Sequence, residues 1–170
     1  MEYILNMKRQ SGHAYRQAGL TLIEIIIYVA IVGLMSTAFV TMMINMMNLK
    51  TKSQAIQEVN LSLKFIVDKI DFEIKNASSL GTITSSSIAT NRATFDLNSG
   101  NMRMTVGGTI ANLNSNLVNI SAFVVTNLSS GDSKTENINY SITGNYVNPG
   151  GRSEFTYSTT IESSSEVRAK

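Results

Sequence analysis

The arrangement of apolar and polar residues divides the chain into three regions. The first holds twenty consecutive uncharged residues, from Ile25 to Ile44, whose only small polar side chains are Ser36, Thr37 and Thr41. At 1.5 Å per residue, a helix of this length is about 30 Å long and matches the hydrocarbon core of a bilayer. We expect one membrane-spanning helix rather than a buried core helix, because nothing downstream is apolar enough to bury so uniform a rod.

In the second region, apolar residues recur at intervals of three and four. They are Ile56, Val59, Leu63, Ile66, Ile70, Ile74 and Ala77. This spacing predicts an amphipathic helix with a single apolar stripe. Since neither Pro nor Gly occurs between Met35 and Leu80, we expect one continuous helix from Leu20 to Ala77, ended by Gly81. The stripe needs an apolar partner, which is the C-terminal region or, alternatively, a second helix in a coiled coil.

Charged residues return after the uncharged segment and occupy the other faces of the predicted helix. Three pairs of opposite charge are four residues apart, namely Lys64–Asp68, Lys69–Glu73 and Asp71–Lys75. Such pairs each stabilise a helix by about 0.2–0.5 kcal/mol. We therefore interpret the charges as a solvated face of the helix.

The third region, from Asn76 onward, is rich in Ser, Thr and Asn. Its short β-prone runs predict strands at Thr82–Ile88, Thr94–Leu97, Met102–Val106, Val118–Asn127, Asn137–Thr143 and Phe155–Ile161. Turn residues stand at 98–100, 107–108, 130–132 and 148–151. The run 120–125 is the most apolar and is expected to be central, whereas residues 163–165 are expected in a loose tail. The predicted fold class is α+β, a long N-terminal helix packed against an antiparallel β-sheet head.

The composition of the chain excludes several classes of catalytic and metal-binding site. The chain has no cysteine, and its only histidine is His13, so thiol nucleophiles, thiolate zinc sites and disulfides are excluded. The acids of the head are scattered, at Asp96, Asp132, Glu136, Glu154, Glu162 and Glu166. Gly107-Gly108 and Gly150-Gly151 are interpreted as turns rather than phosphate loops. We expect no catalytic residue, metal site or cofactor, and therefore no enzyme; a calcium ion at Asp132 and Glu136 is the minor alternative.

One carboxylate stands among isoleucines, Glu24, at the edge of the apolar run. Near the centre of a spanning helix a carboxylate costs about 2.5–3.5 kcal/mol, and less toward an end. Taken alone, Glu24 could simply reach the headgroups. Its sequence context favours another role: Arg16-Gln17-Ala18-Gly19 followed by Leu20-Thr21-Leu22-Ile23-Glu24.

This segment closely resembles the processing site of type IV prepilins and pseudopilins. The resemblance implies cleavage between Gly19 and Leu20 by the prepilin peptidase, on the cytoplasmic side, and N-methylation of Leu20. Glu24 is then the fifth mature residue and acts in assembly, and Thr21 is the polar second residue. The family more often has phenylalanine where Leu20 stands. The implied divisions are a cleaved leader at 1–19, a transmembrane half of the helix at 20–48, its amphipathic half at 49–78 and a β-rich polar head at 79–170.

Cleavage would create a cation for the buried acid. The new α-amine of Leu20 lies one helical turn from Glu24, and pairing relieves most of the cost of desolvating a carboxylate. The resemblance implies pairing between subunits, which sets their axial register; pairing within one subunit stays open. Gly33 lies mid-span and is interpreted as a site of close helix packing, or of helix loosening, as the resemblance implies. The proline often found where Thr41 stands is absent.

The resemblance implies a structural subunit, a minor pilin or pseudopilin of a type IV pilus, type II secretion or competence filament. The head loosely resembles the J-type minor class. The implied location is the bacterial cytoplasmic membrane, crossed once with the N-terminus inside, and later a surface or periplasmic filament. The implied partners are other pilin or pseudopilin subunits, the prepilin peptidase and the inner-membrane assembly platform.

Two alternatives stay open. One is an unprocessed, single-pass anchored protein. The other is a pilus-displayed module that binds surfaces or DNA. Nucleic-acid binding is not expected to be strong, because the net charge is only +2 and no basic block occurs. The cations of the head are Arg92, Arg103, Lys134, Arg152, Arg168 and Lys170.

Overall fold

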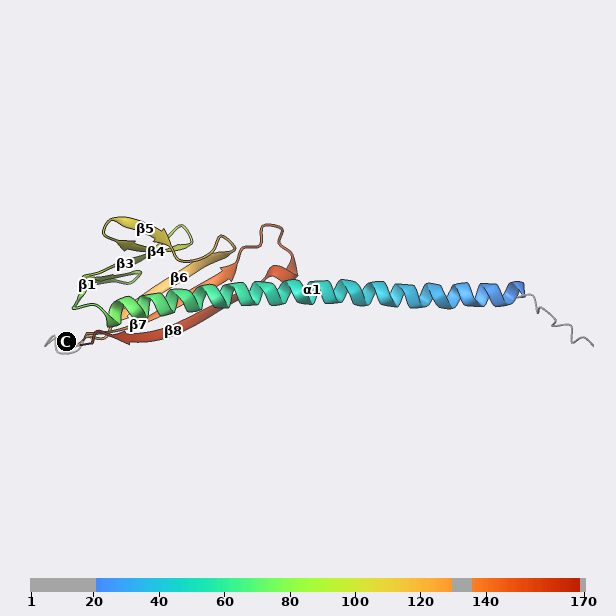
Figure 1. The fold of residues 1–170 in the computed structure, drawn as a ribbon, viewed down its shortest axis with the longest axis horizontal. Helices are drawn as coiled ribbons and strands as arrows, with labels where there is room; N and C mark the ends of the chain where they lie inside the picture. Colours follow the sequence, from blue (N-terminus) through green and yellow to red (C-terminus); the bar gives the residue numbers. More distant parts are fainter. Residues whose placement is uncertain (1–20, 130–135, 169–170) are drawn as a thin grey trace, which may run out of the picture. The chain divides into compact units, whose positions relative to one another are not determined.

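The computed structural model of the chain describes residues 21–129 and 136–168. Within them, one helix, α1 (Leu22–Lys75), precedes all the strands. The strands are β1 (Leu80–Thr84), β2 (Ser87–Thr90), β3 (Thr94–Asn98), β4 (Asn101–Val106), β5 (Thr109–Asn112), β6 (Val118–Asn127), β7 (Asn137–Tyr146) and β8 (Ser158–Glu166), with a 3₁₀ turn, η1 (Ser153–Phe155), before β8 (Figure 1). The chain divides into two compact units, one up to Met43 and one from Ile44 onward, and each is described by itself.

The long helix predicted from the sequence is confirmed, and its observed bounds lie within two residues of the predicted ones. It ends at Lys75, where the side-chain amide of Asn76 donates a hydrogen bond to the Phe72 carbonyl, 2.7 Å away. This bond gives a donor to one of the carbonyls that have no partner at the end of a helix. Gly81, predicted to end the helix, instead lies in β1, so that prediction is wrong.

Strands β1 to β5 form an antiparallel sheet in sequence order. Its tight turns match the predictions: Ser99 and Gly100 have φ of 49° and 79°, and Gly107 and Gly108 have φ of 55° and 84°. Two consecutive residues with positive φ fit the right-handed twist of a hairpin. The single strand predicted at Thr82–Ile88 is wrong, since a turn at 85–86 separates β1 from β2. Strand β5 was not predicted.

Strands β6, β7 and β8 form a second antiparallel sheet, in which β7 is central. Strand β6 has the predicted bounds, but it pairs with one strand only, so its predicted central position is wrong. Its other edge meets the first sheet, where the amide of Val125 donates to the Ser85 carbonyl at 3.0 Å. The loose tail predicted at 163–165 is also wrong, because these serines pair with β7. Phe155, predicted to begin the last strand, lies in η1.

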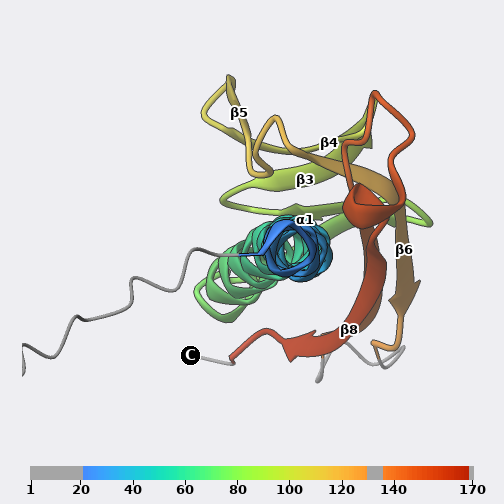
Figure 2. The same cartoon turned by 90° about the vertical axis from the view of Figure 1, so that its right-hand side faces the viewer.

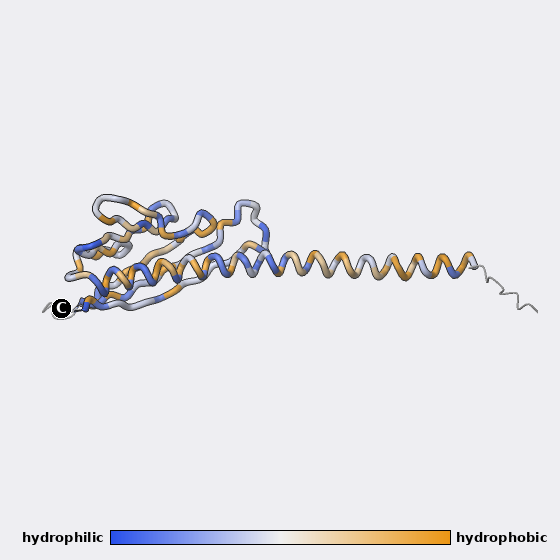
Figure 3. The backbone as a smooth tube through the Cα atoms, viewed as in Figure 1, coloured by the Kyte–Doolittle hydropathy of each residue, from blue (hydrophilic) through white to orange (hydrophobic). Residues whose placement is uncertain are grey.

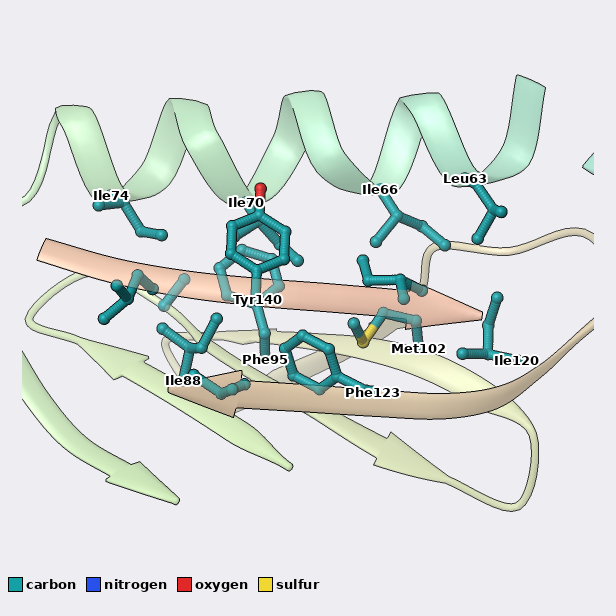
Figure 4. Packing of buried hydrophobic residues seen from close by; sticks show 14 of the residues in the cluster. Leu63, Ile66, Ile70, Ile74, Ile88, Phe95, Met102, Ile120, Phe123 and Tyr140 are labelled. Atoms are coloured by element: carbon teal, nitrogen blue, oxygen red, sulfur yellow. The ribbon is translucent and has the colours of Figure 1, made fainter. Parts of the chain in front are cut away.

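The core of the second unit lies between the apolar stripe of α1 and both sheets. Figure 2 shows the strands curving around one side of this part of α1. Leu63, Ile66, Ile70 and Ile74 of the helix are fully buried, and Figure 4 shows them facing side chains from both sheets, Phe95 and Tyr140 among them. Burying each such aliphatic side chain contributes about 1.5–3 kcal/mol. The head is therefore the partner of the stripe, and the predicted α+β class is confirmed.

Candidate functional site

The first turn of α1 carries the two described residues to which the sequence assigned an assembly role, Thr21 and Glu24. Thr21 caps the helix: its carbonyl accepts hydrogen bonds from the amides of Glu24 (3.0 Å) and Ile25 (3.2 Å), and its Oγ1 accepts from the amide of Glu24 at 3.4 Å. A threonine at this position with an acid three residues later is a common helix start. Thr21 thus has a local structural task besides any task in assembly.

Glu24 is half-buried and accepts one side-chain hydrogen bond, from the Tyr28 hydroxyl to its Oε1 at 3.2 Å. Tyr28 was missed by the sequence reasoning, although its position four residues after Glu24 was a usable signal. No cation forms an ion pair with Glu24 within residues 21–129 and 136–168. The carboxylate therefore stays available to a positive group from elsewhere.

The surface of α1 from Ile25 to Ile44 carries no charge and is mostly apolar on every side. Every residue from 25 to 50 is exposed, and Figure 3 shows mostly hydrophobic positions along the first half of the helix. Among the described residues, α1 is the one helix long and apolar enough to cross a membrane. Its small polar side chains donate to carbonyls of their own helix, Ser36 to Val32 at 2.7 Å and Thr41 to Thr37 at 2.9 Å. Satisfied in this way, they remain compatible with lipid.

Gly33 makes a notch in this apolar surface. A Cβ built on it would meet no atom within 4 Å. A small residue with open space beside it lets the backbone of another helix approach closely. The predicted roles of Gly33 stay predictions, and Gly19 and Leu20 of the predicted processing site lie outside the described residues.

Three acids on the second half of α1 do not form the solvated face that was predicted. Glu58 accepts a hydrogen bond from the Ser115 hydroxyl at 2.6 Å, and Asp71 accepts one from the Tyr140 hydroxyl at 2.6 Å. Burial, and next the hydrogen bond to Asp71, raise the pKa of Tyr140, which therefore stays a donor. These acids attach the head to the helix.

Glu73 is the most buried of these acids, with 6% of its surface exposed. Its carboxylate lies 3.1 Å from Lys69 Nζ and 3.1 Å from Arg92 Nε. Burial by itself would raise the pKa of Glu73, but the hydrogen bonds from Lys69 and Arg92 outweigh burial and hold the pKa below its ordinary value. The predicted pairs Lys69–Glu73 and Asp71–Lys75 are present, the latter at 3.8 Å, whereas Lys64 and Asp68 form no pair in the described part of the chain.

The cations of the head are largely engaged within the chain. Arg92 pairs with Glu73, Arg103 with Asp96, and Arg152 with Glu154. Lys134 and Lys170 lie outside the described residues. Paired guanidinium groups offer little attraction to phosphates, so the arrangement gives no support to the DNA-binding alternative.

The acids proposed as a minor calcium site are not shown together. Glu136 accepts a hydrogen bond from the Leu80 amide at 2.7 Å and so ties the start of β1 to the residue before β7, whereas Asp132 lies outside the described residues. Over residues 21–129 and 136–168, no group of three or more His, Cys, Asp or Glu side chains is placed to hold a metal ion.

Comparison with known proteins gives one match. A family model described as the prokaryotic N-terminal methylation motif matches residues 15–40. The match covers the last five residues of the predicted leader, including Arg16 and Gly19, together with Glu24 and Gly33, and it confirms the resemblance found in the sequence. No curated protein and no solved structure matches the chain. The motif together with the long apolar helix indicates a membrane-anchored structural protein, and the match does not extend to the head.

Proposed function

We propose that this chain, whose N-terminal segment marks it as a type IV pilin-like precursor, is a minor pilin or pseudopilin that assembles into a filament through α1. In this proposal the helix inserts in the cytoplasmic membrane with the N-terminus inside. The prepilin peptidase cleaves between Gly19 and Leu20, and Leu20 is N-methylated. Sibling subunits and an inner-membrane assembly platform are its partners, and its role is structural rather than catalytic.

The observation that carries the proposal is Glu24 on an exposed apolar helix with no cation from the described chain beside it. In lipid, an unpaired carboxylate is costly because it loses its hydration without a compensating charge. Processing supplies a positive α-amine at Leu20, one turn away in the same subunit and, in an array of parallel helices, also near the Glu24 of a neighbour. Pairing across subunits would fix how far one helix is shifted along the next.

A second apolar surface extends the contact beyond the span. Leu61, Phe65 and Phe72 are 67%, 55% and 54% exposed, although the stripe that faces the head is fully buried. Their spacing of four and seven residues places them along one face of α1. An apolar helix face that the chain itself leaves uncovered is suited to packing against the helices of neighbouring subunits.

The test uses the full chain expressed with its peptidase and sibling subunits. We expect the intact mass of the membrane form to show loss of residues 1–19 and gain of one methyl group. Gly19→Trp should block both changes while insertion continues. Glu24→Ala should be processed normally but lose most of its incorporation into sheared filaments, because the charge pair is absent.

The matched control is Glu162→Ala, which removes an exposed acid from the head and should be incorporated like the wild type. An intact Met1 in cells that contain the peptidase would favour the unprocessed anchored protein. Normal incorporation of Glu24→Ala would show that the charge pair is dispensable.

A further inference from the structure

A pocket lies beside α1 just beyond the uncharged segment. It has a volume of about 440 Å³ and is lined by Asn45, Asn48, Leu49 and Lys52 of the helix and by Ser153 and Glu154 of η1. The helix residues follow the spacing i, i+3, i+4, i+7, so they share one face. The pocket belongs entirely to the unit that begins at Ile44.

The wall opposite the helix is held rigidly. The Asn148 side chain donates to the Arg152 carbonyl at 2.7 Å and accepts from the Arg152 amide at 3.1 Å. The Phe155 ring stacks on Tyr146, with centroids 5.7 Å apart and an 8° angle between the rings. Ser153 lies between these two anchors in the sequence, and its hydroxyl donates a hydrogen bond to Glu154 Oε2 at 3.4 Å.

The charges around the pocket leave one cation without a counterion. Glu154 pairs with Arg152, so these two charges offset each other. Lys52 forms no ion pair within the described ranges, and the amides of Asn45 and Asn48 are exposed. One ammonium and two side-chain amides therefore line the pocket as donor groups, next to the apolar side chain of Leu49. This set suits a single phosphate that carries an apolar substituent.

The position of these residues along the helix points to the source of that phosphate. Asn45 follows directly on Ile44, and Asn48 lies about 6 Å from Ile44 along the axis, at the depth of the headgroup layer for a helix whose span is 25–44. Lys52 lies one turn beyond Asn48, and helical side chains lean toward the N-terminus, which directs its ammonium back to the same level.

We propose that this pocket binds the phosphodiester of a membrane phospholipid. Lys52 contributes the charge, the amides of Asn45 and Asn48 donate hydrogen bonds, and Leu49 contacts the glycerol and the start of an acyl chain. The proposal rests on the membrane insertion proposed above. A bound lipid would fix the depth at which the head is held before the subunit leaves the membrane.

The experiment reconstitutes the full chain in vesicles of phosphatidylethanolamine and phosphatidylglycerol, extracts it in mild detergent, and counts retained phospholipids by native mass spectrometry. We expect one phospholipid per chain. Lys52→Gln should lower the retained fraction about tenfold, as loss of a charge-assisted hydrogen bond does. Lys64→Gln removes the same charge from an exposed position on the same helix and should change nothing.

Three results would overturn the inference. Equal losses in Lys52→Gln and Lys64→Gln would mean diffuse attraction to the membrane surface. Complete displacement of the lipid by soluble glycerol phosphate would mean a site for free phosphate. A chain that resists alkaline extraction from the vesicles yet retains no lipid would overturn this inference alone, whereas a chain that does not insert would overturn the proposed membrane anchoring as well.

Discussion

The two halves of α1 contain similar aliphatic residues in opposite surroundings. Ile27 in the first half is 51% exposed, whereas Ile70 in the second half is fully buried against the head. Helix formation is common to both, so the difference lies in which surface covers the side chains. The second half finds its apolar partner within the chain, whereas the first half finds none among the described residues and has the composition of a helix that lies in lipid.

The acids of the two halves repeat this contrast. Glu73 receives two cations, Lys69 from its own helix and Arg92 from the head. Glu24 receives a single tyrosine hydroxyl and, from the described residues, no cation. An acid satisfied internally stabilises the fold of one subunit, whereas an acid left unsatisfied can stabilise contacts between subunits.

The largest expected effect comes from replacing an isoleucine by alanine, and we compare this substitution in the two halves of α1. Ile70→Ala should lower the free energy of unfolding of the head by about 2–5 kcal/mol, because it leaves a cavity in the core. Ile27→Ala should change it by less than about 0.5 kcal/mol. Urea unfolding of the detergent-solubilised chain, followed by tyrosine fluorescence, measures both. Should Ile70→Ala fail to fold, Ile70→Val at about 0.5–1.5 kcal/mol replaces it; equal effects at the two sites would contradict the contrast.

A smaller effect concerns the satisfied acid and depends on pH. The pKa of Glu73 is lower in the folded head than its ordinary value of 4.5, so the unfolded chain binds the proton more readily. The resulting stabilisation is complete above about pH 4.5 and is lost as the pH falls through the folded pKa. Glu73→Gln should lack this loss and be about 1 kcal/mol less stable at neutral pH.

Unfolding free energies measured from pH 3 to 7 test this prediction. Glu162→Gln removes an exposed acid of the head and should stay within about 0.5 kcal/mol of the wild type at neutral pH. An unchanged pH dependence in Glu73→Gln would show that other groups cause the acid sensitivity.

The smallest effect is expected from replacing a glycine by alanine, at Gly144 in the head and at Gly33 in the exposed half of α1. A Cβ on Gly144 in β7 would lie 3.0 Å from Leu63 Cδ2, whereas a Cβ on Gly33 would meet nothing. Gly144→Ala forces Leu63 to shift and should cost about 1 kcal/mol. Gly33→Ala should leave unfolding of the head unchanged, since it lies in the exposed half. Thermal unfolding of the head in both variants tests this prediction. If Gly144→Ala is as stable as the wild type, the helix and β7 have room to separate.

The sequence predicted α1 and its stripe well because periodicity reports directly on which face is buried. Strand β6 was also predicted at its full length from its apolar run. The turn at 85–86 contains only serines, without the Gly, Pro or Asn that mark turns, so β1 and β2 were merged. The serines of β8 pair through their backbone, which is indifferent to side-chain polarity, so composition suggested a tail instead.

At the candidate site, residue identity located Glu24 and Thr21, but it did not reveal their contacts. Tyr28 was within reach of a spacing argument, whereas the contacts of Glu58, Asp71 and Glu73 join residues far apart in the chain. The same holds for Asn114, a buried amide that accepts from the Met102 amide at 2.8 Å and donates to the Val118 carbonyl at 2.6 Å. The sequence does not single out Asn114 among the many asparagines of the head, because its hydrogen bonds depend on how the strands around it are arranged.

The pairing of β8 with β7 has a consequence for biosynthesis. The stripe of α1 is made before the head, and the strands that cover it include residues 137–166, which are made long after it. Long-range contacts of this kind form only after the intervening chain is available. The stripe therefore stays bare until the strands of the head are complete, whereas the apolar half of α1 needs no partner from the head to be complete.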